Sequence, residues 1–296
     1  TLRSVLKGAG NYLPQKILTN SELSKMVDTS DDWITSRTGI QQRHIAAEGE
    51  LTSDLAVAAA RDALQNAGVE VDEIDQIIVA TTTPDMTFPS TASYVQKKLG
   101  ATGSAFDVQA VCSGFIYGMA VADSMIRNGL SQTTLLIGAE TMSRILDWSD
   151  RNTCVLFGDG AGAVILQAEP ETQKSGPGVL GNYLRNDGSY TDSLYVSGGT
   201  SFNQQAGFIN MNGKEVFRNA VNNISDAILS LLDLTGVEMA EVDWFVPHQA
   251  NQRIISSVGQ KIGLDKDKII MTVAQHANTS AASVPLAFSQ ALVDGR

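Results

Sequence analysis

A cysteine stands where one apolar pattern changes into another. Cys112 lies near the middle of residues 105–119, and the small residues Ser113 and Gly114 follow it directly. From Phe115 onward apolar residues recur every three or four positions, which predicts a helix that begins near Cys112 and ends near Gly129. A helix N-terminus favours a thiolate through its partial positive charge and unpaired N–H groups. We therefore expect a nucleophile with a lowered pKa; the alternative is a small buried apolar residue, the usual state of a free cysteine.

Two later segments carry polar groups that complement a nucleophile. His248 follows a short apolar run that predicts a strand at residues 244–246, and Asn278 precedes a helical pattern. A cysteine, a histidine and an asparagine brought together would make a nucleophile with two neutral hydrogen-bond donors.

The elements that must position these residues repeat along the chain. Residues 68–75 and 236–243 share Gly, Val, Glu, Glu and Asp in the same order, 168 positions apart. A helical pattern precedes each segment, at 53–66 and 216–234, and a strand pattern follows each, at 76–81 and 244–246. Chance similarity is the alternative, but the matching order favours a duplication.

Alternating helices and strands predict an α/β protein in two similar halves, residues 1–170 and 171–296. Functional groups in such halves gather at the carboxyl ends of the strands. Cys112 from the first half should then face His248 and Asn278 from the second.

Composition excludes several classes of protein. The 296 residues are 43% hydrophobic and 18% charged, which is typical of a globular chain with a large core. No apolar run approaches the roughly 18 residues of a membrane span, and the N-terminus does not resemble a signal peptide, so we expect a cytoplasmic protein. Two cysteines make no disulfide framework, no Cys/His spacing predicts a metal site, and a net charge of −11 disfavours nucleic acid as a partner.

Other motifs allow two interpretations. Trp33 and Arg37 share one face of a predicted helix and could stack on a base and pair with phosphate; the alternative is an arginine that snorkels over a tryptophan. The glycines of residues 158–162 lack the ending of a phosphate-binding loop and are interpreted as turn glycines. We expect Cys154 to be a core residue on a strand at 153–157.

Four motifs together resemble one family. They are Cys112-Ser113-Gly114 and the segments 157–163, 247–251 and 278–283, and residues 31–44 also look like the family's N-terminal signature. They resemble β-ketoacyl-acyl-carrier-protein synthase III, the initiating condensing enzyme of bacterial type II fatty-acid synthesis. The resemblance implies the thiolase fold, five layers αβαβα from two duplicated halves, in a homodimer.

The resemblance also implies a reaction. Cys112 would take an acyl group from acyl-CoA, and malonyl-acyl-carrier protein would then lose CO₂. His248 and Asn278 would stabilise the resulting enolate by hydrogen bonds while its carbon attacks the acyl-cysteine. No metal or redox cofactor is required.

Binding residues follow from the same resemblance. Trp33 and Arg151 resemble the pair that sandwiches the adenine of CoA, with Arg37 nearby. The remaining residues assigned to CoA line the pantetheine channel or its mouth: Gly213, Phe217, Ala250, Asn251 and Arg253. Phe88 resembles the aromatic residue that reaches across the dimer into the partner's acyl pocket. The basic residues Arg218, Arg253 and Lys261 would dock the acidic carrier protein, with Arg253 shared between both substrates.

The chain departs from the family at its end. The family continues into a glycine-rich strand whose N–H completes the oxyanion hole, whereas this chain stops at Arg296. We expect a truncated record, because missing strands would leave sheet edges uncovered. The resemblance leaves two alternatives: a related synthase of secondary metabolism, and a non-catalytic module that binds acyl-CoA or carrier protein.

Overall fold

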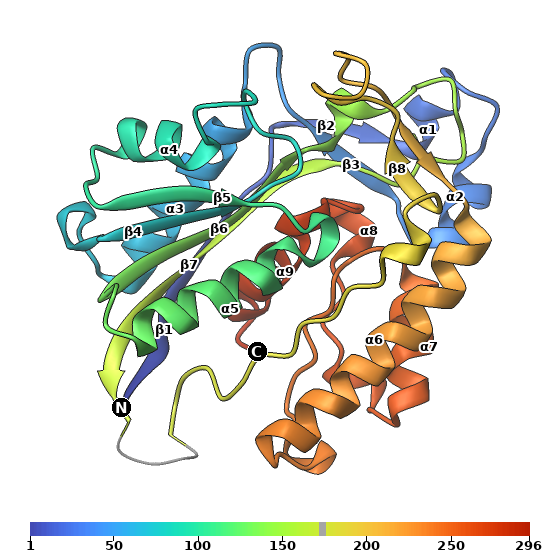
Figure 1. Ribbon diagram of the computed structural model, residues 1–296. Coiled ribbons are helices and arrows are strands. Elements are labelled where there is room, and N and C mark those ends of the chain that lie inside the picture. Colours follow the sequence, from blue (N-terminus) through green and yellow to red (C-terminus); the bar gives the residue numbers. More distant parts are fainter. Residues whose placement is uncertain (172–175) are drawn as a thin grey trace.

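A five-stranded sheet organises the first half of the molecule (Figure 1). The computed structural model describes residues 1–171 and 176–296. The strand order is β1-β7-β6-β4-β5. These strands are β1 (Leu2–Tyr12), β4 (Gln76–Ala80), β5 (Ser104–Val108), β6 (Thr133–Thr141) and β7 (Asp159–Pro170). β4 runs parallel to β5 and β6, whereas β7 is antiparallel to both β1 and β6.

Helices cover both faces of this sheet. α3 (Thr52–Ala67) and α4 (Thr91–Leu99) pack on one face, and α5 (Gly114–Arg127) and α9 (Ser283–Val293) on the other (Figure 1). Successive strand residues point to opposite faces, so Ile77 and Val79 join the core under α3 while Ile78 joins the core under α5. Apolar residues on both faces explain why β4 is a continuous apolar run.

Smaller elements surround this core. β2 (Lys16–Thr19) pairs antiparallel with β3 (Gln42–Ile45), and the chain between them forms α1 (Asn20–Leu23) and α2 (Asp31–Thr38). β8 (Leu194–Val196) pairs with β9 (Ile209–Met211). The second half adds α6 (Gly213–Thr235), α7 (Gln252–Ile262) and α8 (Val273–His276). Short 3-10 turns connect many of these: η1 (Val71–Glu73), η2 (Val111–Ser113), η3 (Met142–Ile145), η4 (Gly188–Tyr190), η5 (Met239–Glu241), η6 (Lys266–Lys268) and η7 (Ser280–Ala282).

The repeat predicted from the sequence is visible in the local structure. α3 ends at Gly68 and α6 at Gly236, both with left-handed backbone (φ 65° and 69°). Each is followed by a 3-10 turn with the same cap. The N–H of Glu70 donates to the side chain of Glu73, and the N–H of Glu238 donates to the side chain of Glu241. β7 ends at Pro170, beside the predicted division near that residue.

The predictions of strands at residues 244–246 and 153–157 are wrong. Residues 244–246 form only one parallel bridge, between Phe245 and Ile269, because no longer extended partner lies beside them within the described residues. Residues 153–156 form turns, since the N–H of Cys154 bonds back to the carbonyl of Asp150, and Phe157 forms a single bridge with Asn278. Cys154 itself is fully buried, as expected of a core residue.

Two glycines on neighbouring strands bring the second half against the sheet. Gly138 on β6 is paired with Gly162 on β7. A Cβ at Gly138 would lie 2.3 Å from the carbonyl oxygen of Ala281, and one at Gly162 would lie 2.6 Å from the backbone nitrogen of Leu286. Backbone can approach the sheet this closely only where no side chain intervenes.

We predict that Gly138→Ala lowers the free energy of unfolding by about 1–3 kcal/mol or more, because backbone atoms must move to admit the methyl group. Urea denaturation would measure the loss. Gly188→Ala is the matched control, since a Cβ there would meet nothing within 4 Å. Equal midpoints for the two variants would contradict the close-approach argument.

Candidate active site

Cys112 lies on a strained turn between β5 and α5. The turn is η2, and α5 begins two residues later at Gly114. Val111 has φ 49°, a conformation that is rare for a β-branched residue and is often found at functional sites. A Cβ at Gly114 would lie 3.2 Å from the Cβ of Ala281. The glycine thus lets the start of α5 pack against η7, which belongs to the second half.

The thiol of Cys112 is protonated at neutral pH. Burial raises the pKa of Cys112 to about 11; the nearby Glu140 carboxylate also raises it, and the Ser280 hydroxyl lowers it. The expectation of a lowered pKa is therefore wrong. Loss of hydration outweighs the favourable end of α5, although the side chain of Cys112 is only partly buried.

His248 is held as a neutral hydrogen-bond donor. Its Nδ1 lies 2.6 Å from the Oγ of Ser283, and the same oxygen accepts the N–H of Gln249 at 3.2 Å. Ser283 has no other acceptor for its proton among the described residues, so its hydroxyl donates to Nδ1 and the imidazole proton resides on Nε2. Burial lowers the pKa of His248 to about 4, which keeps the ring neutral at pH 7.

Asn278 is held by its own loop. Its backbone N–H donates to the carbonyl of Leu156 at 2.9 Å, and its carbonyl accepts the N–H of Gly158 at 3.1 Å. The side-chain Oδ1 accepts the N–H of Ser280 at 2.9 Å, and Nδ2 makes no hydrogen bond within residues 1–171 and 176–296. Ala277 (φ 57°) and Ser280 (φ 51°) flank it in left-handed conformation. The amide group is thus fixed, with Nδ2 available as a donor.

One short segment links all three predicted catalytic residues. Asn278 begins it, Ser280 lies beside Cys112, and Ser283 holds the His248 ring. This segment therefore contacts elements from both predicted halves of the molecule.

Trp33 and two arginines form a stack at the surface. The Arg37 guanidinium lies 4.7 Å from the centre of the indole ring, and that of Arg151 lies 5.2 Å from it. Arg151 also donates to the backbone carbonyl of Asp28 at 3.0 Å. Arg37 adopts the snorkelling geometry of the alternative interpretation, and Arg151 gives the ring a second cation.

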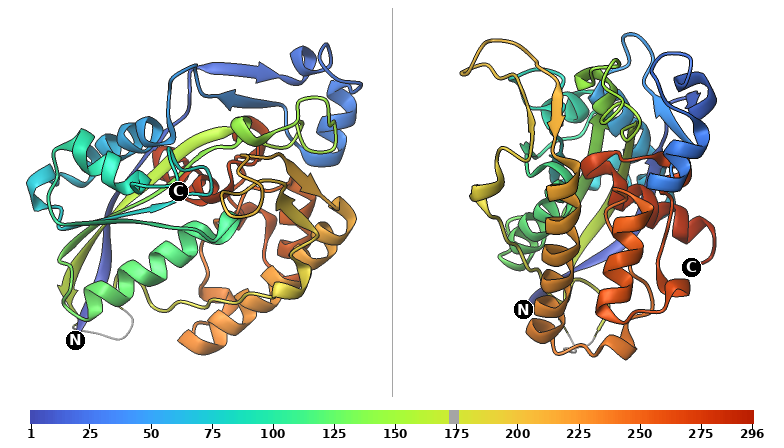
Figure 2. Two further views of the ribbon diagram at one scale, coloured as in Figure 1. Left: turned by 45° about the horizontal axis from the view of Figure 1, so that its top comes forward. Right: turned by 90° about the vertical axis from the view of Figure 1, so that its right-hand side faces the viewer.

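The residues assigned to CoA lie on or beside α2, α6 and α7, and α6 and α7 run side by side (Figure 2). The Nδ2 of Asn251 donates to the carbonyl of Arg37 at 3.3 Å, and its Oδ1 caps α7 by accepting the N–H of Arg253 at 2.8 Å. The Arg253 guanidinium lies 5.7 Å from the ring centre of Phe217 on α6. Gly213 begins α6, and Ala250 precedes the cap of α7. These contacts connect α2, α7 and α6.

The three basic residues lie on adjacent helices. Arg218 on α6 and Arg253 and Lys261 on α7 are all exposed. Lys261 donates to the Oδ1 of Asn222 at 2.9 Å and lies 4.0 Å from the carboxylate of Asp226, so part of its charge is already paired. Residues 218, 222 and 226 follow helical spacing and share one face of α6, which places Arg218 on the side that meets α7.

Phe88 is 80% exposed, in the loop between β4 and α4. A large apolar side chain with so little cover within its own chain fits the expected contact with a second subunit.

Sequence reasoning missed three residues around the site. Ser280 and Ser283 orient the catalytic candidates, and Glu140 is a fully buried carboxylate on β6. Glu140 had a usable signal, because it is the one charged residue in the otherwise uncharged run 133–141. Both serines lie in the recognised motif 278–283, but their roles depend on contacts across the fold.

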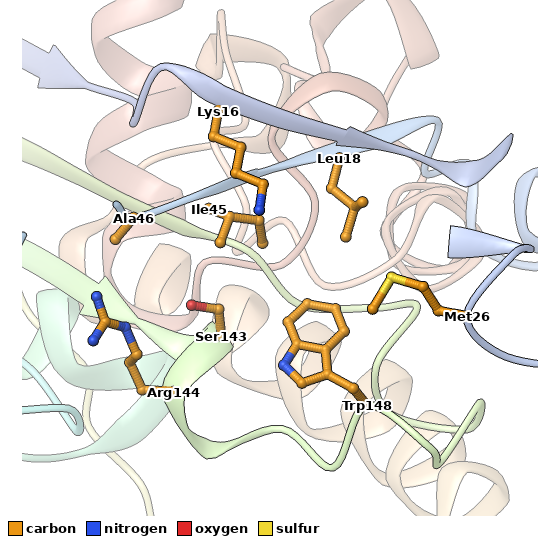
Figure 3. A pocket seen from close by; sticks show the side chains of 8 residues that line it. All are labelled: Lys16, Leu18, Met26, Ile45, Ala46, Ser143, Arg144 and Trp148. Atoms are coloured by element: carbon orange, nitrogen blue, oxygen red, sulfur yellow. The ribbon is translucent and has the colours of Figure 1, made fainter. Parts of the chain in front are cut away.

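A separate cavity of about 330 Å³ shares no residue with this site (Figure 3). It is lined by Lys16, Leu18, Met26, Ile45, Ala46, Ser143, Arg144 and Trp148. The described residues contain no cluster of three or more His, Cys, Asp or Glu side chains that could hold a metal. None of the described helices has the length and apolar character needed to span a bilayer.

Comparisons with known proteins identify the family. The family model for 3-oxoacyl-[acyl-carrier-protein] synthase III matches residues 106–188, and its C-terminal model matches residues 232–296. A β-ketoacyl-[acyl-carrier-protein] synthase III from Caulobacter vibrioides is 57% identical over 100% of this chain and 92% of its own length, and one from Rhodospirillum centenum is 56% identical with the same coverage. The chain belongs to the β-ketoacyl-acyl-carrier-protein synthase III family.

Family membership confirms the predicted fold and enzyme class. The crystal structure of the 3-oxoacyl-[acyl-carrier-protein] synthase III from Aquifex aeolicus superposes with a TM-score of 0.91, at 43% identity, covering 99% of this chain and 91% of that one. The synthase therefore has the thiolase-like α/β fold and is an acyltransferase, not a non-catalytic binding module. Within the described residues, the second half forms the two-stranded β8–β9 sheet and isolated bridges such as Phe245–Ile269.

We predict that His248 stays neutral from pH 5 to 8. Its folded pKa of about 4 lies below the roughly 6.5 of an unfolded histidine. Between these two pH values the unfolded state binds a proton at His248 and the folded state does not. His248 therefore lowers stability as the pH falls from about 6.5 toward 4. Ring NMR spectra, assigned with His248→Gln, would follow the titration, and a midpoint near 6.5 in the folded synthase would refute the neutral-donor assignment.

Proposed function

We propose that Cys112, His248 and Asn278 carry out the family's reaction, the condensation of an acyl-CoA with malonyl-acyl-carrier protein that initiates fatty-acid synthesis. Cys112 takes the acyl group as a thioester and CoA leaves with the proton of the thiol. Because burial raises the pKa of the thiol, Cys112 rests protonated and loses its proton as the acyl group arrives. The reaction needs no prosthetic group. Acyl-CoA takes part as a substrate and not as a resident cofactor.

The observation that carries the proposal is that one segment, residues 278–283, holds two neutral donors and also borders Cys112. The Nε2–H of His248 and the Nδ2 of Asn278 are both held by the segment 278–283, which also borders the thiol. Decarboxylation of the malonyl group places negative charge on the thioester oxygen of the enolate. Fixed neutral donors stabilise charge that exists only during the reaction, and the loss of one typically costs about 10²–10³ in rate.

CoA binding is assigned to the surface around Trp33. The indole and the two arginine planes offer faces for the adenine, and the arginines offer charge for phosphates. Asn251 connects this surface to the segment that carries His248. A pantetheine arm would pass between them, beside Gly213, Phe217 and Ala250.

We also propose a homodimer and a cytoplasmic location. β5 is an edge strand of the central sheet, and Phe88 projects from the loop between β4 and α4 with 80% of its surface exposed. Unpaired edges and exposed aromatic rings favour association with a second chain. The cytoplasmic location is a prediction from the sequence.

We predict that incubation with acetyl-CoA adds one acetyl group to Cys112, seen by mass spectrometry of the intact protein and its peptides. Cys112→Ser should abolish the adduct and leave the fold intact. His248→Ala and Asn278→Ala should retain acylation but lose about 10²–10³ in malonyl decarboxylation.

Two results would contradict this assignment of roles. An acetyl group on Cys154 would place the nucleophile elsewhere. A block of acylation in His248→Ala as complete as in Cys112→Ser would make His248 mainly a base for the thiol.

We predict that the triple variant Arg218→Glu, Arg253→Glu, Lys261→Glu weakens the malonyl-carrier step more than acylation by acyl-CoA. Each exposed charge contributes only about 0.2–1 kcal/mol, so single changes should be small and the triple change clear. Kinetics of both half-reactions over a salt series would measure the effect.

A charge-matched control reverses three exposed cations on other elements: Lys16, Arg61 and Lys97. This variant should leave the carrier step unchanged. Equal kinetics and equal salt dependence for both triple variants would place the docking surface elsewhere.

A further inference from the structure

Glu140 is a fully buried carboxylate beside the nucleophile. It lies near the end of β6, in the middle of the sheet, and none of its surface is exposed. No lysine, arginine or histidine of the described residues forms an ion pair with it. An acid buried without a cation needs hydrogen bonds to compensate for its lost hydration.

Three consecutive threonines supply those hydrogen bonds. They follow the carboxyl end of β4, next to β6 in the sheet. The carboxylate accepts the Oγ1–H of Thr81 at 3.1 Å, the N–H of Thr82 at 3.0 Å, and both the N–H (3.1 Å) and the Oγ1–H (2.6 Å) of Thr83. Glu140 therefore fixes the loop that leaves β4.

From this loop one contact leads to the nucleophile turn. The Oγ1 of Thr82 accepts the Nε2–H of Gln109 at 3.1 Å. Gln109 precedes the η2 turn, on which Cys112 lies. The position of the sulfur thus depends on an anchored loop as well as on the strained Val111.

A second connection passes through Ser280. Its hydroxyl is buried and meets no partner with full hydrogen-bond geometry among the described residues, although it lies close enough to lower the pKa of both Glu140 and Cys112. Ser280 also holds Asn278 through its N–H. A single hydroxyl proton cannot serve both neighbours at once, so the carboxylate and the sulfur compete for it.

The charge of Glu140 acts on the thiol. Burial raises the pKa of Glu140 to about 7, while its bonds to Thr83, Thr82, Ser280 and Thr81 lower it. The carboxylate is faced by the threonine loop from β4, by Ser280 from η7 and by Cys112 from η2, and Cys112 is the titratable group among these. Negative charge near a thiol disfavours the thiolate.

We propose that Glu140 is a positioning residue for the nucleophile: it anchors the Thr81–Thr83 loop beside the turn of Cys112, and its buried carboxylate adds to the cost of ionising the thiol. The catalytic meaning of this arrangement rests on the proposed role of Cys112. Glu140 and Ser280 act in opposite directions, because the carboxylate opposes ionisation of the thiol and the hydroxyl favours it.

The test is the pH profile of Cys112 alkylation by iodoacetamide, with the modified cysteine identified by mass spectrometry. Glu140→Gln keeps the shape of the side chain and removes the charge, so we expect the pKa of Cys112 to fall; a fall of one unit would speed alkylation at pH 8 about tenfold. Ser280→Ala removes the hydroxyl, so the profile should move to higher pH and alkylation should slow. A purely structural disturbance would not move the two profiles in opposite directions.

Asp75→Asn is the matched control. Asp75 accepts hydrogen bonds from the Ser131 hydroxyl and from the N–H groups of Gln132 and Thr133. These contacts lie at the amino ends of β4 and β6, so the variant loses a similar carboxylate at the end of the same strands that is far from Cys112. Its profile should match that of the unaltered protein.

Unmoved profiles, or shifts of both variants in the same direction, would overturn the proposal. If Glu140→Gln does not fold by circular dichroism, Ser280→Ala decides alone: a shift to higher pH supports the proposal and an unmoved profile refutes it. Alkylation does not require Cys112 to be catalytic. Failure of acetyl transfer to Cys112 would therefore refute the proposed function without changing this result.

Discussion

The close approach of residues 278–286 to the central sheet is the contact on which the site depends. It exists because Gly138 and Gly162 are cross-strand partners and leave room for backbone where side chains would clash. The same segment ends in α9, whose apolar face packs on β7 and β1. Burial of α9 supplies the free energy that holds the polar start of the segment in place, since hydrophobic burial is the dominant favourable contribution to folding.

Burial then determines what each group in the site can do. The same exclusion of water keeps His248 neutral and Cys112 protonated, because it disfavours the charged form of either side chain. It also strengthens hydrogen bonds aimed at a developing charge. Strained backbone at Val111, Ala277 and Ser280 is tolerated there because the surrounding packing fixes those conformations.

The sequence located the helices and the reactive side chains because both depend on local patterns. Helical spacing predicted α3 and α6 to within a few residues, and residue type singled out Cys112. The acidity of that thiol was predicted with the wrong sign, since burial is a property of the whole fold. The strand at 244–246 failed for a similar reason: an apolar run becomes a strand only if another extended segment pairs along it.

Very little chain separates the surface that would hold a nucleotide from His248, the donor that would stabilise the enolate. His248 and Arg253 are five residues apart, so their backbones cannot lie more than about 18 Å from each other. Between them Asn251 caps α7 and bonds to Arg37 on α2, which ties the segment to the Trp33 stack. Because a helix cap and a side-chain bond fix this short segment, the distance between surface and donor is set by the fold. A substrate whose head group binds at Trp33 would then need an arm of one particular length to place its thioester beside Cys112.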